Sequence, residues 1–231
     1  MTKNLNPNNR ILALLPLKDY QHLLPALEDF ELIFGKTIYE PGERISHIYF
    51  PESGIVSLLS SVAEKATIEV GIVGSEGMIG LPVFLGVETS NNLAIVQGAG
   101  TAQRIKTADF LAECKNGGEL PRLLQRFTHS LLTQISQSAA CNRFHQIEAR
   151  LARWLLMTHD RMRNDKFRIT QEFLSNMIGV RREAVNKAAT HFQQQQLISY
   201  SRGNLSILNR AELEKAACQC YRIIKAEADI L

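Results

Sequence analysis

Five polar side chains between residues 181 and 187 have the types and the spacing that reading a nucleic-acid base requires. They are Arg181, Arg182, Glu183, Asn186 and Lys187, and the last four fall at i, i+1, i+4 and i+5 on one predicted helix face. Arginine can donate two hydrogen bonds to guanine, and glutamate can accept one from the amino group of cytosine. Lysine contacts guanine or phosphate with less geometric precision than arginine does. The spacing therefore predicts a recognition helix that enters the major groove of DNA.

The residues around Gly179 predict two short helices that pack at an angle. Gly179 would supply the unusual backbone conformation of a tight turn, and the small side chain of Ser175 would let the helices approach closely. Thr170 is placed to cap the first helix. The apolar side chains that would bury the angle are Leu174, Ile178, Val180, Val185 and Ala188. This pattern predicts a helix-turn-helix; the alternative is an ordinary surface helical hairpin with a charged face.

Two short β-prone runs follow the second helix, at residues 197–200 and 205–208. Because the turn between them contains Arg202, Gly203 and Asn204, they predict a hairpin. A helix-turn-helix followed directly by a hairpin is a winged helix. Arg202 at its tip would contact the phosphate backbone, which adds affinity without sequence information. The alternative for this one residue is a solvated turn arginine.

The overall composition is that of an ordinary globular chain. Its 231 residues suffice for two domains, and 45% of them are hydrophobic and 21% charged. The net charge of +3 is too small to indicate a polyanionic partner, but ten Lys and Arg face five Asp and Glu between Arg143 and Lys187. The sequence shows no apolar run of membrane-spanning length and no secretory signal, so we expect a cytoplasmic protein without a membrane partner.

The cysteines and histidines suggest neither a metal site nor a cofactor. The four cysteines are Cys114, Cys141, Cys218 and Cys220. Their spacing matches no standard zinc or iron–sulfur framework, and a cytoplasmic chain would keep them reduced. A redox role for Cys218-x-Cys220 is the alternative to free thiols on a helix. Single histidines are more often surface or core residues than haem ligands, which applies to His22, His47 and His129.

The N-terminal half has the texture of a small β structure that follows a helical segment. Residues 8–30 predict helices, and from residue 31 to 105 short β-prone runs alternate with Gly and Pro turns. This alternation is typical of an antiparallel barrel or jelly roll. Tight turns also explain the spacing of Gly71, Gly74, Gly77 and Gly80 better than a phosphate loop does.

An apolar stripe predicts a long helix from about residue 120 to 141. It consists of residues that recur every three or four positions, namely Leu120, Leu124, Phe127, Leu131, Ile135 and Ala139. The stripe is close to a coiled-coil seam without being a strict heptad. Because it leads into the predicted DNA-reading unit, we favour a dimer seam over packing against the chain's own barrel.

The order of barrel, long helix and winged helix resembles the cyclic-AMP receptor protein and fumarate–nitrate regulator (Crp/Fnr) family of bacterial transcription factors. The resemblance extends from about residue 20 to 210 and is strongest at residues 169–170, 178–185 and 197–198. It implies an α+β fold with a cyclic-nucleotide-binding-like β jelly roll (1–115), a dimerisation helix (116–142) and a winged helix-turn-helix (143–231). It also implies that Arg182 and Glu183 read bases, that Lys187 stands where many relatives carry an arginine, and that Arg181 contacts phosphate.

The same resemblance implies a degenerate ligand pocket. Members that bind cyclic AMP hold the ribose with the glutamate of a Gly-Glu-Leu segment and the phosphate with the arginine and serine of an Arg-Ser-Ala segment. Met78 aligns with that glutamate, and Asn92 and Leu93 align with the arginine and the serine. Because these side chains cannot supply the charged contacts, we predict that cyclic AMP does not act through the usual site. The clustered N-terminal cysteines of the oxygen-sensing branch are also missing, since the first cysteine is Cys114.

The sequence therefore predicts a homodimeric transcription regulator that reads a palindromic site on double-stranded DNA. RNA polymerase and an unidentified small-molecule effector are the further partners it suggests. The alternatives are a ligand-binding module whose winged helix docks protein, and a regulator that does respond to a cyclic nucleotide. An enzyme is the weakest interpretation, because the sequence presents no paired carboxylates, no Ser/His/Asp set and no metal-spaced ligands.

Overall fold

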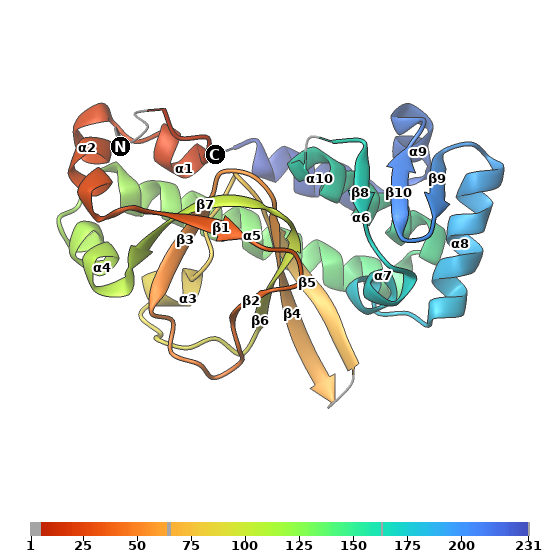
Figure 1. The fold of residues 1–231 in the computed structure, drawn as a ribbon, viewed down its shortest axis with the longest axis horizontal. Helices are drawn as coiled ribbons and strands as arrows, with labels where there is room; N and C mark the ends of the chain where they lie inside the picture. The colour runs from red at the N-terminus through yellow and green to blue at the C-terminus, as the bar shows by residue number, and fades with distance from the viewer. Residues whose placement is uncertain (1–5, 64–65, 163, 231) are drawn as a thin grey trace. The chain divides into compact units, whose positions relative to one another are not determined.

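The computed structural model describes residues 6–63, 66–162 and 164–230, and within it the chain separates into two compact units (Figure 1). The first, which we call the β-rich unit, comprises Met1–Leu58, Ile72–Leu132 and Glu227–Leu231. The second, the helical unit, comprises Leu59–Gly71 and Thr133–Ala226. The long helix α5 (Glu119–Phe144) passes from one unit into the other.

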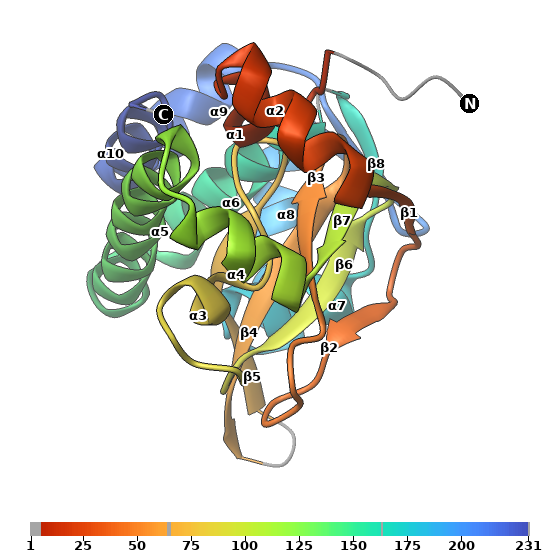
Figure 2. The same cartoon turned by 90° about the vertical axis from the view of Figure 1, so that its left-hand side faces the viewer.

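Among the described residues of the N-terminal half, seven strands form two sheets. The first sheet has the order β1-β7-β3, made of Glu28–Leu32, Gly100–Lys106 and His47–Pro51. The second has the order β2-β6-β4-β5, made of Thr37–Tyr39, Leu93–Gly98, Ile55–Ala63 and Ala66–Val73. Strand β7 pairs antiparallel with both β1 and β3 (Figure 2). The predicted jelly-roll-like β structure is confirmed.

Short helices flank these sheets. They are α1 (Arg10–Ala13), α2 (Leu17–Leu23), the 3-10 turn Leu24–Ala26, α3 (Leu81–Phe84) and α4 (Thr107–Lys115). The sequence predicted helix up to residue 30, whereas the structure starts strand β1 at Glu28. Pro25 explains the early end, because it occupies the short 3-10 turn and cannot continue an α-helix. Phe30 then pairs with Ala102 of β7, a partner too distant in sequence for local propensity to reveal.

The N-terminal part of the apolar stripe of α5 packs inside the β-rich unit, where the sequence analysis favoured a dimer seam. Leu124 is fully buried, and Leu120, Phe127 and Leu131 are each less than a tenth exposed in the single chain. A Cβ added at Gly77 would lie 2.2 Å from the Phe127 ring, so the ring and the glycine backbone are in direct contact. Hydrophobic burial against the chain's own core therefore accounts for this part of the stripe.

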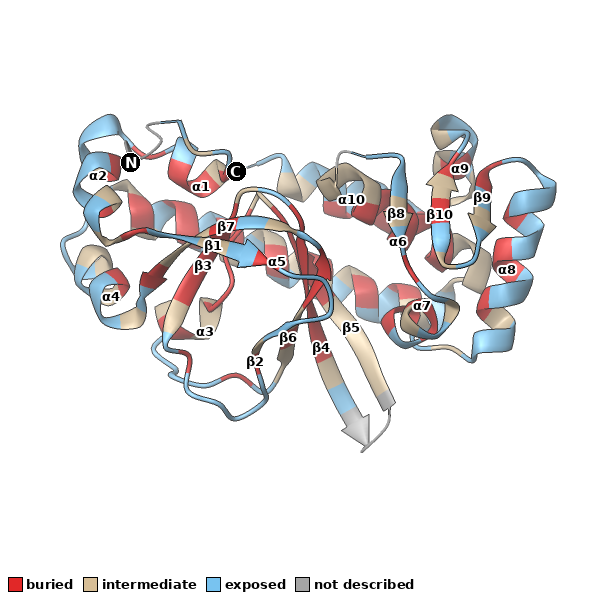
Figure 3. Cartoon of the chain, viewed as in Figure 1, coloured by how far each residue is buried: buried red, intermediate tan, exposed pale blue. Residues whose placement is uncertain are grey.

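The helical unit is built around α6 (Ile147–Met162), which is buried along most of its length (Figure 3). Trp154 is 1% exposed, and its indole N–H donates to the Glu69 carboxylate at 2.9 Å. The unit continues with α7 (Gln171–Ile178), α8 (Arg182–Gln194), α9 (Arg210–Ala216) and α10 (Gln219–Ala228). A small sheet has the order β8-β10-β9, made of Lys166–Arg168, Asn204–Ile207 and Ile198–Ser201. This arrangement confirms the predicted winged helix-turn-helix.

Among the described residues, no helix has both the length and the hydropathy that crossing a bilayer would require.

Candidate nucleic-acid interface

Helix α7 begins and ends where the sequence predicts. The Thr170 hydroxyl accepts a hydrogen bond from the Phe173 amide at 3.1 Å, which satisfies one of the free N–H groups of the first turn. At the other end Gly179 has a φ of 63°, and the Val180 amide donates to the Ser175 carbonyl at 3.1 Å. A left-handed glycine is the common way to end a helix. These contacts fix the direction in which the chain enters α8.

Helix α8 separates a buried face from a polar one. Val185, Ala188 and Phe192 are buried, while the opposite side of the helix is exposed (Figure 3). All five predicted DNA-contacting residues of this segment are exposed, namely Arg181, Arg182, Glu183, Asn186 and Lys187. Arg181 is the residue that precedes the helix, and its side chain does not cap it. The free N–H groups and the dipole of the helix N-terminus add a positive potential beside these side chains.

A hydrogen-bond network links the start of α7 to the exposed face of α8. The Gln171 side-chain amide donates to Asn186 Oδ1 at 2.9 Å, and Arg182 Nε donates to Gln171 Oε1 at 3.4 Å. The network engages only Nε of Arg182, so it does not use the terminal Nη groups that would contact guanine. Sequence reasoning missed Gln171. Its position directly after the Thr170 cap, at the end of α7 that faces α8, could have indicated a contact with the recognition helix.

The wing is a two-residue hairpin. Asn204 pairs with Ser201, and the two turn residues Arg202 and Gly203 have φ angles of 50° and 77°. Positive φ at both positions is the mark of a type I′ turn, which matches the twist of a β-hairpin. Arg202 is exposed at the tip, as predicted. The Ile169 amide donates to the Gly203 carbonyl at 2.7 Å, which ties the wing to the chain just before α7.

A buried arginine supports the turn of the helix-turn-helix. Arg150 of α6 is 7% exposed, and its Nη2 donates to the Ile178 carbonyl at the C-terminal end of α7. The positive charge also complements the negative end of the helix dipole there. Arg153, one turn further along α6, is 6% exposed and donates to Ser138 Oγ at 3.2 Å. Both arginines therefore belong to the interior of the unit.

The basic residues counted between Arg143 and Lys187 do not all lie at the surface. Arg150 and Arg153 are buried, and Arg163 lies outside the described residues. The exposed members include Lys166 and Arg168 of β8.

Replacing Gly179 by alanine is expected to destabilise the helical unit by about 1–2 kcal/mol, because an L-residue is strained at positive φ. A Cβ at this position would also lie 2.7 Å from Ile68 Cδ1. Urea unfolding together with DNA-binding titration checks the change. Gly117→Ala is the matched control, because Gly117 also has a positive φ but a Cβ added there would meet no atom within 4 Å. Weaker DNA binding by Gly117→Ala than by Gly179→Ala would contradict the role of this turn.

The predicted pocket residues lie on separate segments of the β-rich unit. Met78 is 1% exposed, next to Ile79, whose amide donates to the Tyr49 carbonyl at 2.8 Å. Asn92 is half-buried, and its backbone N–H donates to Ser90 Oγ at 3.0 Å. Leu93 opens β6 and is also half-buried. No carboxylate, guanidinium or hydroxyl is present at these three positions.

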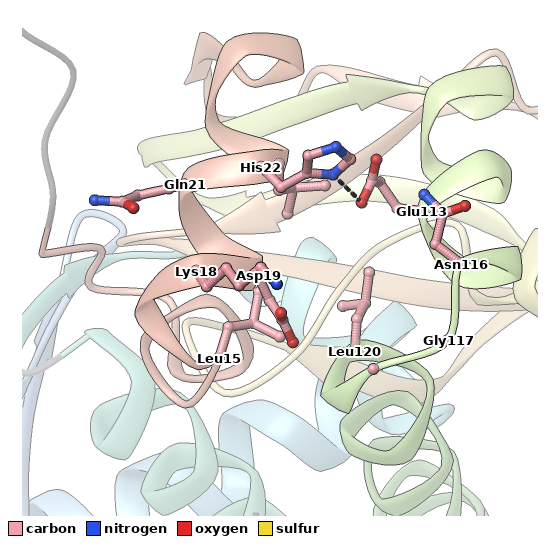
Figure 4. A pocket seen from close by; sticks show the side chains of 11 residues that line it. Leu15, Lys18, Asp19, Gln21, His22, Glu113, Asn116, Gly117 and Leu120 are labelled. Carbon is pink, nitrogen blue, oxygen red and sulfur yellow. Dashed lines mark hydrogen bonds and ion pairs between the residues drawn. The ribbon is translucent and has the colours of Figure 1, made fainter.

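A separate hollow of about 510 Å³ in the β-rich unit does not offer a phosphate site either (Figure 4). Its lining includes Lys18 and His22, but also the carboxylates of Asp19 and Glu113. His22 Nδ1 lies 2.9 Å from Glu113 Oε2, so the imidazole is already engaged by an acid. An anionic ligand would meet at least as much negative as positive charge there. The hollow includes none of the three predicted pocket residues.

The histidines weighed as haem ligands have ordinary polar partners. His22 contacts Glu113, as described above; His129 Nε2 lies 3.4 Å from Glu227 Oε2, and His47 Nδ1 lies 3.0 Å from Ser46 Oγ. His22 and His129 are exposed, and His47 is half-buried.

Comparison with known proteins supports the assignment of the fold. Residues 149–216 match the family model described as the Crp-like helix-turn-helix domain. A Crp/Fnr-family transcriptional regulator from Eubacterium rectale has a similar structure, with a TM-score of 0.71 and 16% identity over 90% of this chain and 98% of that one. FixK2 from Bradyrhizobium japonicum gives a TM-score of 0.70 with 14% identity, over 83% of this chain and 98% of that one.

A third similar structure is CLP from Xanthomonas campestris, described as a global regulator responsive to c-di-GMP. It gives a TM-score of 0.68 with 15% identity, over 83% of this chain and 99% of that one. At these identities the likeness shows the fold. The comparison with curated proteins gave no significant match.

Proposed function

We propose that this chain, which carries a Crp-like helix-turn-helix domain and has the fold of Crp/Fnr transcriptional regulators, is a homodimeric regulator that binds specific DNA sequences. The observation that carries the proposal is the exposed N-terminal face of α8. There Arg181, Arg182, Glu183, Asn186 and Lys187 project from a helix whose other face is buried. This is the part of a recognition helix that enters the major groove.

The exposed side chains divide by the chemistry they offer. Arg182 and Glu183 would read bases, since arginine pairs with guanine and glutamate accepts from cytosine. Asn186 accepts a hydrogen bond from Gln171 through Oδ1, and its amide group keeps donors for a base or phosphate oxygen. Arg181, Lys187 and the wing residue Arg202 would contact phosphates or the groove edge, which sets the position of the protein on the duplex.

The exposed face of α5 supports a dimer of two identical chains. Gln125, His129, Leu132, Ser136 and Ala139 are all exposed and follow one another at steps of four and three. That is the spacing of a coiled-coil seam. Leu132 is 57% exposed on this face, whereas Leu120, Leu124, Phe127 and Leu131 of the first predicted seam are buried. Ala139, the last member of that stripe, is exposed and belongs to both sets. Two recognition helices related by a two-fold axis would read half-sites about 34 Å apart, and so a palindrome.

The regulatory part of the proposal rests on the β-rich unit. With Met78, Asn92 and Leu93 in place of the charged contacts, we propose that cyclic AMP is not an effector through the usual site. An unidentified small molecule would then control the regulator, which acts in the cytoplasm on double-stranded DNA and on RNA polymerase. The protein is not proposed to be an enzyme.

Salt dependence tests whether the partner is DNA. Binding that neutralises phosphates releases counterions, so the logarithm of affinity should fall linearly with the logarithm of salt concentration. A fluorescence-anisotropy titration on duplex DNA at several salt concentrations measures this slope. If the protein shows no affinity for duplex DNA at low salt and instead captures another protein through α8, its winged helix docks protein.

Replacing Arg202 by alanine is expected to weaken binding to all duplexes by a similar factor, because phosphate contacts carry no sequence information. The slope of the logarithm of affinity against the logarithm of salt concentration should fall in magnitude by about one for each wing that contacts DNA. Lys215→Ala is the control, since Lys215 is an exposed cation of the same unit on α9, outside both the recognition helix and the turn of the wing. A change in sequence preference, with the slope unchanged, would contradict a phosphate-contacting role for Arg202.

A further inference from the structure

Four side chains that commonly bind metals meet inside the helical unit. The sulfur atoms of Cys141, Cys218 and Cys220 and a ring nitrogen of His145 all lie within 4.8 Å of one another. Cys141 and His145 are one helical turn apart at the end of α5. Cys218 precedes α10, and Cys220 lies in its first turn. Two segments about seventy residues apart in the sequence thus each contribute two potential ligands.

The distances fit one ion with tetrahedral coordination. Cys141 Sγ lies 3.4 Å from Cys218 Sγ, and Cys220 Sγ lies 3.6 Å from His145 Nδ1. Zinc binds sulfur at about 2.3 Å and imidazole nitrogen at about 2.0–2.1 Å, which in a tetrahedron separates two sulfurs by about 3.8 Å and sulfur from nitrogen by about 3.6 Å. A disulfide would bring two sulfurs to about 2.05 Å. An iron–sulfur cluster would spread its cysteines over several iron atoms.

The three cysteines of the cluster are enclosed, and His145 is half-buried at its edge. Cys141, Cys218 and Cys220 are all buried in a small apolar core with Ala149 packed against them. Four protein ligands with no open position are typical of structural zinc sites rather than catalytic ones.

Two buried cations lie within electrostatic range of these sulfurs. Arg150 interacts electrostatically with Cys141 and Cys218, and Arg153 does so with Cys141 and Cys220. The contacts of the two guanidiniums described above are to uncharged groups, and the Nε atom of each is buried without a hydrogen-bond partner. Buried positive charge is unfavourable unless a negative charge compensates it. Three thiolates with one divalent ion carry one net negative charge, whereas three neutral thiols carry none.

We propose that Cys141, His145, Cys218 and Cys220 bind one Zn²⁺ ion, with the cysteines as thiolates and the histidine as neutral imidazole. Each cysteine gives up its proton when the metal binds. The ion would fasten the start of α10 to the end of α5, next to the helix that carries Arg150. The proposal does not depend on DNA binding. From the sequence we expected no metal site, because only the linear spacing of the cysteines was compared with known frameworks. The proposed zinc site replaces that expectation.

Elemental analysis of the purified full-length protein tests the site directly. Inductively coupled plasma mass spectrometry should find one zinc per chain after extensive dialysis. Cys218→Ser and Cys220→Ser should lose most of it, and His145→Ala should bind it more weakly. Cys114→Ser is the matched control, because Cys114 lies in α4 of the β-rich unit and should leave the zinc content unchanged.

Two further measurements keep the proposal testable if a cysteine variant fails to fold. In the Cys114→Ser protein, a mercurial thiol reagent should release one zinc for every three thiols titrated, with the metal detected by a coloured chelator. Cobalt exchanged into the same protein should show the strong visible bands of tetrahedral Co²⁺ and a thiolate-to-metal charge-transfer band.

Several results would overturn the proposal. They are a wild-type protein without bound metal that also fails to give the cobalt bands, an iron content that replaces zinc, and a Cys141–Cys218 disulfide in place of a metal in the protein as isolated. Zinc that persists in Cys218→Ser and Cys220→Ser would place the ion elsewhere and equally contradict it.

Discussion

Replacing Arg182 by alanine is expected to remove much of the preference for the operator over random DNA. A good bidentate arginine–guanine contact contributes about 1–3 kcal/mol of discrimination. A dimer loses two such contacts, so the loss would be about 2–6 kcal/mol, or roughly 30-fold to 10⁴-fold in affinity for the operator. Fluorescence-anisotropy titrations on operator and scrambled duplexes, at one fixed salt concentration, measure both affinities.

Two control variants separate base reading from charge. Arg182→Lys keeps the positive charge but lacks the fork of donors, so it should lose specificity while retaining affinity for scrambled DNA. Gln171→Ala removes the partner that holds Arg182 Nε at 3.4 Å, and it should produce a smaller loss on the operator alone. An equal loss on operator and scrambled DNA for Arg182→Ala would contradict the base-reading role of Arg182.

Replacing Arg150 by methionine is expected to destabilise the helical unit by about 2–3 kcal/mol. The substitution removes a hydrogen bond from a charged donor and leaves the Ile178 carbonyl without that partner, and such bonds contribute about 1.5–3 kcal/mol. Methionine is close to arginine in length and fills most of the space, so the lost interaction rather than a cavity should dominate. Urea unfolding monitored by Trp154 fluorescence measures the change in the free energy of unfolding.

Arg161→Met is the matched control for this substitution. Arg161 lies on the same helix and also donates to a carbonyl, that of Met157 at 3.0 Å, but it is only half-buried. Water can replace its hydrogen bond, so its loss should cost less than about 1 kcal/mol. Hydrogen exchange should also become faster in α7 and at the start of α8 in Arg150→Met only. Equal stability of the two variants would show that the desolvation of Arg150 cancels its interaction with α7.

The parts of the fold that could be predicted from the sequence are those set by local contacts. Thr170 and Gly179 define the two ends of α7 through hydrogen bonds that span only a few residues. The wing follows from Arg202 and Gly203, because a two-residue turn needs residues that tolerate positive φ. The exposed face of α8 follows from the helical period around the buried Val185.

What the sequence did not reveal depends on contacts between distant segments. The apolar stripe around Leu124 has the same period whether it faces a second chain or the chain's own core, and only the fold decides between them. Arg150 reads as a surface cation by residue type, although it is buried against the end of α7. Cys141 and Cys218 are 77 residues apart, so no spacing rule brings their sulfurs to 3.4 Å. Tertiary packing determines all three positions.

Selection of random duplex DNA by the full-length protein, with and without cyclic AMP, tests the central claim most directly. The proposal predicts that a palindromic motif is enriched equally in both conditions, and that Arg182→Ala protein fails to enrich it. Enrichment only with cyclic AMP would contradict the interpretation of Met78, Asn92 and Leu93. Failure to enrich any motif in either condition would contradict the claim that the protein reads DNA sequence without an added ligand.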